Sequence, residues 1–475
     1  MISGVFLLLI FPVLMASIVY ILLRWASLSA LLATASAMAL GFATLVLPLN
    51  QPVHFWGDRQ IVMNESVTFL GRELLLEQSD RMAMTLLFFT AAGLFLLAWR
   101  FAPHSLLFPM GLSLLSLLSG ALLIRPLIYA ALLIEIAAGL SIFALQSQDS
   151  APAKGGLRYL TFTTLALPGL LVTHWLLERY AITPDETELL NIASILLGIS
   201  FALLLGVAPF HTWVSAISDD SVPLASAFIL TIGNGAIWFL LLDFLETYPW
   251  LSAHPRFGSI LFTAGMAMVI TGALLASAQR RAGSLMGYGA LADTGAALIA
   301  LAMNNELGVT LVILSLIMRP FGLILMAAGL SGLRARSGKN DNFDALRGLG
   351  WKAPWSTTAF LLGGLSVAGA PLGAGFIWRW PLCRALASSG SGAMLVILLA
   401  CVGVMVGVWK TLSSLLMRPR SPKDRSVVSF ISSEGWLTAA VVVTAILVYF
   451  GVELCPQTLA PLATHMAATY TFFTP

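Results

Sequence analysis

Residues 188–213 read ELLNIASILLGISFALLLGVAPFHTW. A helix that crosses a bilayer needs about 20 mainly apolar residues, and the run from Leu189 to Ala208 meets this requirement. Pro209 follows directly. Because proline lacks a backbone donor and clashes with the preceding helical turn, we expect an interruption near Pro209–His211. The stretch therefore predicts a membrane-spanning helix that breaks near its end.

Composition extends this prediction to the whole chain. The protein has 475 residues, of which 59% are apolar and only 10% are charged, whereas an ordinary soluble domain carries about 25% charged residues. A soluble protein of this length needs more charge to cover its surface. We therefore predict an all-α, polytopic membrane protein surrounded by membrane lipids. The net charge of +3 is too small to favour a nucleic-acid partner.

Fourteen stretches are long and apolar enough to be spanning helices, and an even number places both termini on the same side of the membrane. The segment between the second and third stretches is more polar and has alternating runs, so it predicts a short hairpin near 52–78 on the outer surface. The stretches are 2–22, 27–48, 82–99, 105–122, 124–146, 157–178, 188–208, 222–246, 258–278, 284–302, 307–331, 355–380, 392–416 and 435–454.

The loops on one side of these helices carry most of the Lys and Arg residues, including loops 332–353 and 417–433. Because positively charged loops stay in the cytoplasm, we expect both termini on the outer side of a bacterial or archaeal inner membrane.

A second apolar stretch contains Ala370-Pro371-Leu372-Gly373 and is expected to break near Ala370–Gly375. The two breaks lie five helices apart, and so do two acids in apolar runs, Glu135 and Asp293. Recurrence at corresponding positions favours two inverted repeats. The expected divisions are 1–103 (three helices with the hairpin), 104–256 (first repeat), 257–420 (second repeat) and 421–475 (last helix).

Charges inside the membrane are the candidate functional residues, because each costs at least about 2.5–3.5 kcal/mol to insert. Glu135 is interpreted as a proton-relay carboxylate modulated by a nearby cation, or as half of an ion pair that holds two helices together. Asp293 has the same two interpretations, with Tyr288 and Thr294 as polar groups that would satisfy it. His211 beside the first break is able to exchange protons near neutral pH, or it is an interfacial histidine beside Trp213.

Three basic residues complete the predicted proton pathway: Arg319, Arg379 and Lys410. Arg319 precedes Pro320, whose break would free backbone carbonyls for the guanidinium, in a structural or a relay role. Arginine stays protonated, so Arg379 would steer protons rather than carry them. Lys410 would titrate if it is buried, or it extends toward the cytoplasmic face, which we favour. We expect the acids Asp219 and Asp220 to be loop or helix-cap residues.

Several phrases of this sequence resemble those of the antiporter-like proton-translocating subunits. These subunits occur in respiratory complex I, membrane-bound energy-converting hydrogenases and Mrp-type cation/proton antiporters. The phrases are Ala208-Pro209-Phe210-His211-Thr212-Trp213, Val222-Pro223-Leu224-Ala225-Ser226-Ala227-Phe228, Leu346-Arg347-Gly348-Leu349-Gly350, Gly363–Pro371 and Gly375-Phe376.

The resemblance assigns the family's fifth-helix glutamate to Glu135 and its twelfth-helix basic residue to Arg379. Two family lysines are missing, because Leu204 stands near the first position and Asn234 at or near the second. These residues do not titrate, so the usual chain of proton-carrying groups is interrupted in the first repeat. If the subunit conducts protons, we expect the route to use the second repeat more.

The resemblance implies a membrane-arm subunit that couples redox chemistry in its partners to proton translocation, as part of an oxidoreductase. Neighbouring membrane subunits and a peripheral redox module are the expected partners, with quinone bound in a neighbouring subunit. This chain has no catalytic residues, and its cysteines Cys383, Cys401 and Cys455 form no CxxC motif. We thus expect no metal or cofactor in this chain, and flavin, iron–sulfur or nickel–iron centres in the partners.

Two other functions remain open. The chain is a non-conducting scaffold in one of them. In the other it is a subunit of a cation/proton antiporter or of an ion-coupled complex for uptake of inorganic carbon.

Overall fold

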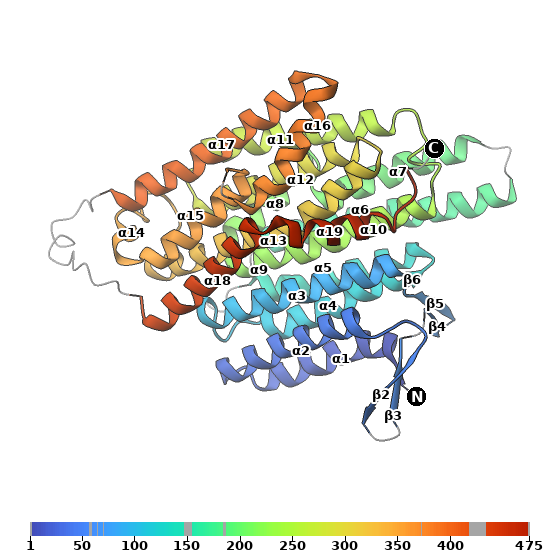
Figure 1. The fold of residues 1–475 in the computed structure, drawn as a ribbon, viewed down its shortest axis with the longest axis horizontal. Coiled ribbons are helices and arrows are strands. Elements are labelled where there is room, and N and C mark those ends of the chain that lie inside the picture. The colour runs from blue at the N-terminus through green and yellow to red at the C-terminus, as the bar shows by residue number, and fades with distance from the viewer. Residues whose placement is uncertain are drawn as a thin grey trace.

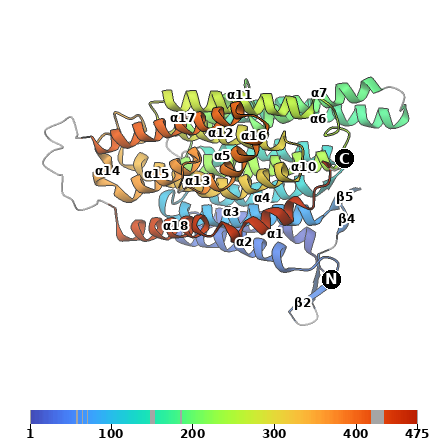
Figure 2. The same ribbon diagram turned by 45° about the horizontal axis from the view of Figure 1, so that its top comes forward.

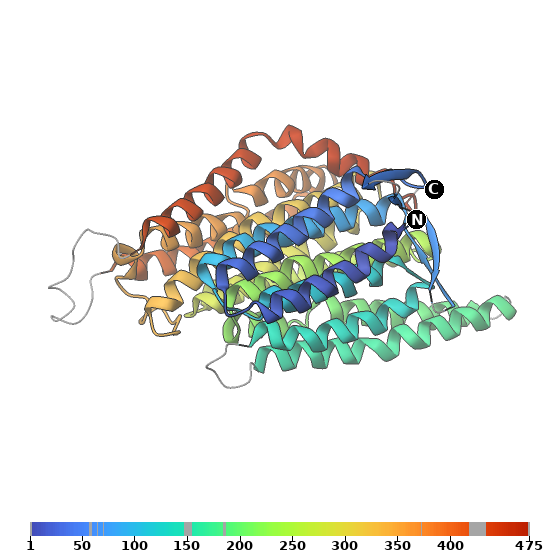
Figure 3. The same cartoon turned by 90° about the horizontal axis from the view of Figure 1, so that it is seen from below.

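The computed structural model describes residues 2–56, 59–63, 65–69, 71–146, 154–183, 187–371, 373–417 and 434–473. Helices run side by side along the long axis of the molecule, and the strands lie together at one end, which we call the strand end (Figure 1). Both termini lie toward this end (Figures 1 and 3). The predicted loop 417–433 lies outside the described residues, apart from Met417.

The described residues contain twelve helices that are long and apolar enough to cross a membrane, which confirms an all-α polytopic membrane protein. The fourteen predicted stretches each coincide with helix, but α4 is shorter and the twelfth stretch is divided into α15 and α16. The count of fourteen spans and the inverted repeats stay predictions.

The described residues of the first half include the α-helices α1 to α10, a 3-10 turn at Leu127–Tyr129 and a π-helical turn, η2. The α-helices and the π-helical turn are α1 (Gly4–Ile21), α2 (Ala26–Val46), α3 (Gln78–Phe101), α4 (Leu107–Leu123), α5 (Ala130–Leu145), α6 (Lys154–Ile182), α7 (Thr187–Leu205), α8 (Thr212–Asp220), α9 (Pro223–Phe228), η2 (Ile229–Gly233) and α10 (Asn234–Thr247).

In the described residues of the second half, the α-helices α11 to α19 follow. They are α11 (Phe257–Ala278), α12 (Ala282–Leu301), α13 (Glu306–Arg336), α14 (Leu349–Lys352), α15 (Pro354–Ala368), α16 (Ala374–Ser389), α17 (Ser391–Leu416), α18 (Trp436–Leu454) and α19 (Ala460–Ala467).

Helices α9, α10, α12 and α13 form the enclosed centre of the bundle, whereas α6, α17 and α18 expose most of their surface. In Figure 2, α13 lies between a layer containing α11 and α17 and a layer containing α1, α2 and α18. The pair α6 and α7 extends beyond the other helices at the strand end (Figure 3). The exposed faces are apolar, as in Leu399 and Trp409, which suits contact with lipid.

The single predicted hairpin is replaced by two. Strands β2 (Pro52–Trp56) and β3 (Arg59–Val62) pair antiparallel, and β1 (Ile2–Ser3) joins β3 in parallel. Strands β4 (Ser66–Phe69) and β5 (Arg72–Leu75) form the second hairpin. The two-residue strand β6 (Ile124–Arg125), between α4 and α5, pairs with β5 and places Arg125 at the strand end.

Both predicted breaks are confirmed. The chain leaves helical geometry between α7 and α8, around Pro209, and between α15 and α16, around Pro371. Each preceding helix ends at a glycine in the left-handed region, Gly206 with φ 69° and Gly369 with φ 73°. In both, the glycine N–H donates to the residue three back and the next N–H to the residue five back, a glycine-specific helix ending.

The break expected at Pro320 does not form, because α13 stays helical through this residue. Pro320 removes one hydrogen bond, but no left-handed glycine precedes it, and its neighbours on α13 are buried on several sides. The Arg319 guanidinium accordingly binds side chains of other helices and not freed carbonyls.

Candidate functional site

Asp293 of α12 lies between two arginines from different helices. Arg319 of α13 donates from Nε to Oδ2 at 2.6 Å, and Arg379 of α16 donates from Nη2 to Oδ1 at 2.7 Å. Each of the three side chains is at most 7% exposed. We call Asp293, Arg319, Arg379 and Asn234 the central cluster. One carboxylate faces two guanidiniums, so the charged groups of the cluster sum to +1.

The remaining guanidinium nitrogens show how the cluster is positioned. Arg319 donates from Nη1 to the amide oxygen of Asn234 at 2.6 Å, and Arg379 donates from Nη1 to the carbonyl oxygen of Val367 at 2.6 Å. That carbonyl would normally accept from the N–H four residues later. Residue 371 is a proline and has none, so the break in the twelfth stretch supplies an acceptor for Arg379.

The central cluster has almost no free space. A cavity of about 10 Å³ adjoins Asp293 and is lined also by Arg319, Ser366 and Trp378. This volume suffices for about one water molecule. Two buried donors among its lining residues, Arg319 Nη2 and Trp378 Nε1, have no hydrogen-bond partner in the part of the chain that the structure describes.

Glu135 on α5 does not contact the central cluster. Its Oε1 accepts a hydrogen bond from the hydroxyl of Thr164 on α6, at 2.6 Å. Its Oε2 is buried and has no partner among the described residues. Glu135 is thus half-buried and contacts the exposed Thr164 of a neighbouring helix, and it forms no ion pair with a cation within the described ranges. The predicted modulating cation is therefore not found beside it.

His211 and Lys410 also lie apart from the central cluster. His211 immediately precedes α8, is half-buried, and its buried Nδ1 lacks a partner in the described parts of the chain. Lys410 is exposed and donates from Nζ to the carbonyl oxygen of Ser277 at 2.6 Å. This contact with the end of α11 agrees with the predicted extension toward the membrane surface. Leu204 and Asn234 are buried. Their side chains do not titrate, so neither is a proton carrier.

An ion-pair network at the end of the bundle opposite the strands was not anticipated from the sequence. Asp341 is fully buried and accepts from Arg281 Nε at 3.1 Å, Arg334 Nη2 at 2.5 Å and the Gly283 N–H at 2.9 Å. Asp219, at the end of α8, also pairs with Arg281. Burial alone would raise the pKa of Asp341, but these partners lower it below its ordinary value.

This network holds α8, the short helix that follows the break at Pro209, against the helices that carry the central cluster. Arg334 of α13 donates to the carbonyl oxygens of Ser218, Asp219 and Ser221 at the end of α8, where helix carbonyls lack partners of their own. Asp219 is therefore a structural residue, as expected. The partner Asp341 is one of two acids, with Asp344, in the polar loop 332–353, which is too weak a sequence signal to identify it.

Comparison with known proteins agrees with this architecture. A family model described as "NADH:quinone oxidoreductase/Mrp antiporter, TM" matches residues 159–406, slightly more than half of the chain. The NADH-quinone oxidoreductase subunit N of Ectopseudomonas mendocina is 32% identical over 200 residues, which cover 40% of this chain and 38% of that protein. The matched regions span less than two thirds of the curated relatives' own length.

Solved structures resemble nearly the whole fold. A chain of an archaeal respiratory membrane complex, the membrane-bound sulfane sulfur reductase, superposes with a TM-score of 0.78 and 14% identity over 98% of this chain and 97% of that chain. A chain of the Mrp complex from a Dietzia species superposes with a TM-score of 0.75 and 17% identity, over 98% of this chain and 97% of that chain. At such identities the likeness shows the fold, whereas the family model matches the sequence itself. The chain therefore belongs to the NADH:quinone oxidoreductase/Mrp antiporter family of membrane proteins.

Proposed function

We propose that this chain is an antiporter-like membrane-arm subunit of a complex I-related, energy-converting complex. In that complex it couples redox chemistry in partner subunits to proton translocation. The observation that supports this proposal most is the central cluster, where a carboxylate and two guanidiniums with an unbalanced charge are enclosed beside a broken helix. Enclosed charges in membrane proteins are costly and mark ion and proton pathways.

Each member of the cluster has a separate part in the proposed mechanism. Arginine does not release its proton, so Arg319 and Arg379 set the electrostatic potential and Asp293 is the group that takes up a proton. Protonation of Asp293 would raise the summed charge from +1 to +2 unless a guanidinium moves away. Proton uptake is thereby coupled to displacement of an arginine, and Arg379 already has a second acceptor in the Val367 carbonyl.

Glu135 is the proposed proton-accepting group of the first half, since its Oε2 is buried without a donor among the described residues. Leu204 and the cluster residue Asn234 do not titrate, so protons would pass between Glu135 and Asp293 only through water. This arrangement supports the expectation that the second half, with Asp293, carries more of the route.

The proposal includes partners that the family resemblance implies. Other membrane-arm subunits would flank this chain, and a peripheral module would hold the flavin, iron–sulfur or nickel–iron centres, with quinone in a neighbouring subunit. The bacterial or archaeal inner membrane is the proposed location, with the strand end and both termini on the outer side.

A non-conducting scaffold is the second candidate function. The observation in its favour is that two buried positions where the family has lysines hold Leu204 and Asn234, and that Lys410 binds a surface carbonyl. An antiporter subunit, or a subunit of an inorganic-carbon uptake complex, is the third and would translocate ions without electron transfer.

The experiment isolates the complex through a tag on this chain and reconstitutes it in liposomes. Electron transfer that acidifies or alkalinises the lumen, and is abolished by an uncoupler, supports the proposal. A complex without redox partners that exchanges cations for protons supports the antiporter function. Electron transfer without any proton movement, in a complex that contains this chain, contradicts the proposed function.

A further inference from the structure

Two aspartates at the strand end form a buried pair that the sequence did not reveal. Asp80 lies in the first turn of α3 and Asp243 lies near the end of α10. They are 1% and 5% exposed, and they lie close enough for each carboxylate to act electrostatically on the other. One oxygen of each, Asp80 Oδ1 and Asp243 Oδ2, is buried and has no donor among the described residues. Two ionised carboxylates only accept hydrogen bonds, so a bond between them requires a proton.

The positive charge beside this pair is too small to balance it. Arg125 approaches Asp80 Oδ2 with Nη2 at 3.4 Å and Glu77 at 3.9 Å, while its Nη1 donates to the carbonyl oxygen of Leu122 at 2.7 Å. Asp80 Oδ2 also accepts the N–H of Glu77. One guanidinium thus faces three carboxylates, the opposite of the central cluster, where two guanidiniums face one.

The other groups that face the pair bring no compensating charge. Glu246 on α10 accepts three hydrogen bonds from Thr471 and Phe472 of the C-terminal segment. The hydroxyl of Tyr470 donates to Asp243 Oδ1 at 3.4 Å. Burial, together with the neighbouring acids, raises the pKa of Tyr470 well above its ordinary value, so this hydroxyl stays protonated and serves only as a donor.

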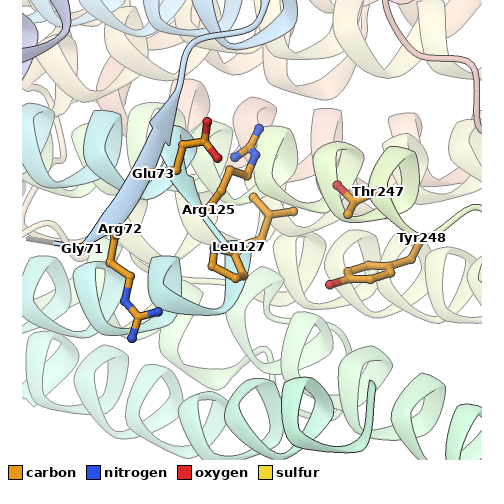
Figure 4. A pocket seen from close by; sticks show the side chains of 8 residues that line it. Gly71, Arg72, Glu73, Arg125, Leu127, Thr247 and Tyr248 are labelled. Atoms are coloured by element: carbon orange, nitrogen blue, oxygen red, sulfur yellow. The ribbon is translucent and has the colours of Figure 1, made fainter. Parts of the chain in front are cut away.

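A cavity adjoins the pair at the strand end, on the side of Asp243. This cavity of about 190 Å³ is lined by Asp243, Glu77, Arg125, Glu246 and Tyr470, and it has room for several water molecules. Arg125 and Thr247 also line a larger recess of about 390 Å³ (Figure 4). In that view Arg125 and Leu127 lie on one side and Thr247 and Tyr248 on the other.

We propose that Asp80 and Asp243 share one proton and form the site where protons exchange between this subunit and the water at the strand end. A hydronium ion in the cavity gives a proton to one carboxylate. The O–H bond of the hydronium breaks, which leaves a water molecule, and a new O–H bond forms on the carboxylate. The new carboxyl O–H donates a hydrogen bond to the second carboxylate. Release of the proton is the reverse of this step. This proton adds the positive charge that Arg125 alone does not supply to the neighbouring carboxylates.

The position of Asp243 connects this site with the central cluster. Asp243 and Asn234 lie on the same buried helix, α10, nine residues and thus about 14 Å apart along its axis. Asn234 accepts a hydrogen bond from Arg319. Displacement of that arginine would break this hydrogen bond to α10, the helix that carries Asp243. The exchange role rests on the proposed function, whereas the shared proton does not.

Infrared spectroscopy of the intact complex tests the shared proton directly. We expect a protonated-carboxyl stretching band near neutral pH that shifts when the complex is labelled with ¹³C-carboxyl aspartate. Asp80→Asn and Asp243→Asn should each abolish the band, because each removes one of the two carboxylates that share the proton. The exposed Asp220 supplies the matched control, Asp220→Asn, which should keep it. Absence of an aspartate-sensitive band from the wild type, its retention in both variants, or its loss on adding Na⁺ overturns the shared proton.

The exchange role is tested by the proton-to-electron ratio of the same variants in liposomes. The ratio should fall in Asp80→Asn and Asp243→Asn and stay at the wild-type value in Asp220→Asn. Assembly is checked by the subunit composition of each complex, and Asp80→Glu, which keeps a carboxyl group, should retain more translocation than Asp80→Asn. Unchanged ratios in assembled variants that have lost the band overturn the exchange role. A wild-type complex that moves no protons contradicts the proposed function instead, and the infrared result still decides the shared proton.

Discussion

At the scale of single residues, the central cluster is defined by the excess of guanidinium over carboxylate. Asp293 neutralises one unit of charge from two arginines, and the second is met only by the neutral acceptors Asn234 and Val367. The three charged residues come from three helices, the consecutive α12 and α13 and the later α16. Their identity as buried charges was predictable from the sequence, because each interrupts an apolar run. Their association was not, since it depends on how α12, α13 and α16 pack.

The charge excess predicts an order of stabilities. Asp293→Asn leaves two buried guanidiniums without a counter-charge and should lower the free energy of unfolding by about 3–5 kcal/mol. Arg319→Gln leaves one carboxylate with one guanidinium, so it should lower the free energy of unfolding by less than Asp293→Asn does. The double variant should be more stable than Asp293→Asn alone. Denaturant unfolding of the subunit in detergent measures this, and additive effects of the two substitutions would contradict the predicted coupling.

The opposite-end network predicts a dependence on pH. The folded pKa of Asp341 lies below its ordinary value of 3.8, so the stabilisation by Arg281 and Arg334 is complete above that value. It is lost as the pH falls through the lower, folded pKa. The unfolding temperature of the wild type should therefore drop more steeply below about pH 4 than that of Asp341→Asn. Parallel curves for the two proteins would show that the carboxylate does not contribute in this way.

At the scale of helices, the two breaks share one ending that prolines alone do not produce. Prolines at positions 12, 168, 320 and 381 lie inside continuous helices. The breaks around Pro209 and Pro371 each begin at a left-handed glycine, Gly206 or Gly369. The sequence predicted both of these breaks correctly and a third, at Pro320, wrongly. Proline was a sufficient signal only where a glycine two or three residues earlier ends the helix.

Gly369 provides a test of the link between the second break and the central cluster. A Cβ added there would lie 2.4 Å from Arg379 Nη1, and a side chain in the left-handed region costs roughly 1–2 kcal/mol. Gly369→Ala should therefore destabilise the subunit and also lower the proton-to-electron ratio by displacing Arg379. Gly338 has a similar φ of 68° but no neighbour within 4 Å of an added Cβ, so Gly338→Ala should carry the backbone cost alone. Equal ratios in the two assembled variants would refute the link.

At the scale of the whole molecule, two buried clusters of opposite charge imbalance each have one member on the enclosed helix α10, Asn234 and Asp243. The central cluster has an excess of positive charge, and the pair of Asp80 and Asp243 at the strand end has an excess of negative charge. The sequence led to the first because its charges lie inside apolar runs. It did not lead to the second because Asp80 and Asp243 lie near helix ends, where acids usually face solvent.

The proposed orientation is tested by cysteine labelling in intact cells. In a background in which the exposed Cys455 is replaced by serine, Glu65→Cys near the strand end and Asn340→Cys in the opposite loop both place a thiol at an exposed position. A reagent that does not cross membranes should label the first variant only, and both after permeabilisation. Labelling of only the Asn340→Cys variant in intact cells would show that the protein has the opposite orientation.

The central claim, that this subunit carries protons through titratable groups of its own, is tested most directly by the proton-to-electron ratio of reconstituted complexes. Asp293→Asn should lower that ratio more than electron transfer, and Glu135→Gln should lower it as well if the two halves are coupled. The exposed acids Asp220 and Glu188 provide the matched controls, Asp220→Asn and Glu188→Gln, which should keep the wild-type ratio. Wild-type ratios for both Asp293→Asn and Glu135→Gln, in fully assembled complexes, would contradict the account and identify the chain as a scaffold.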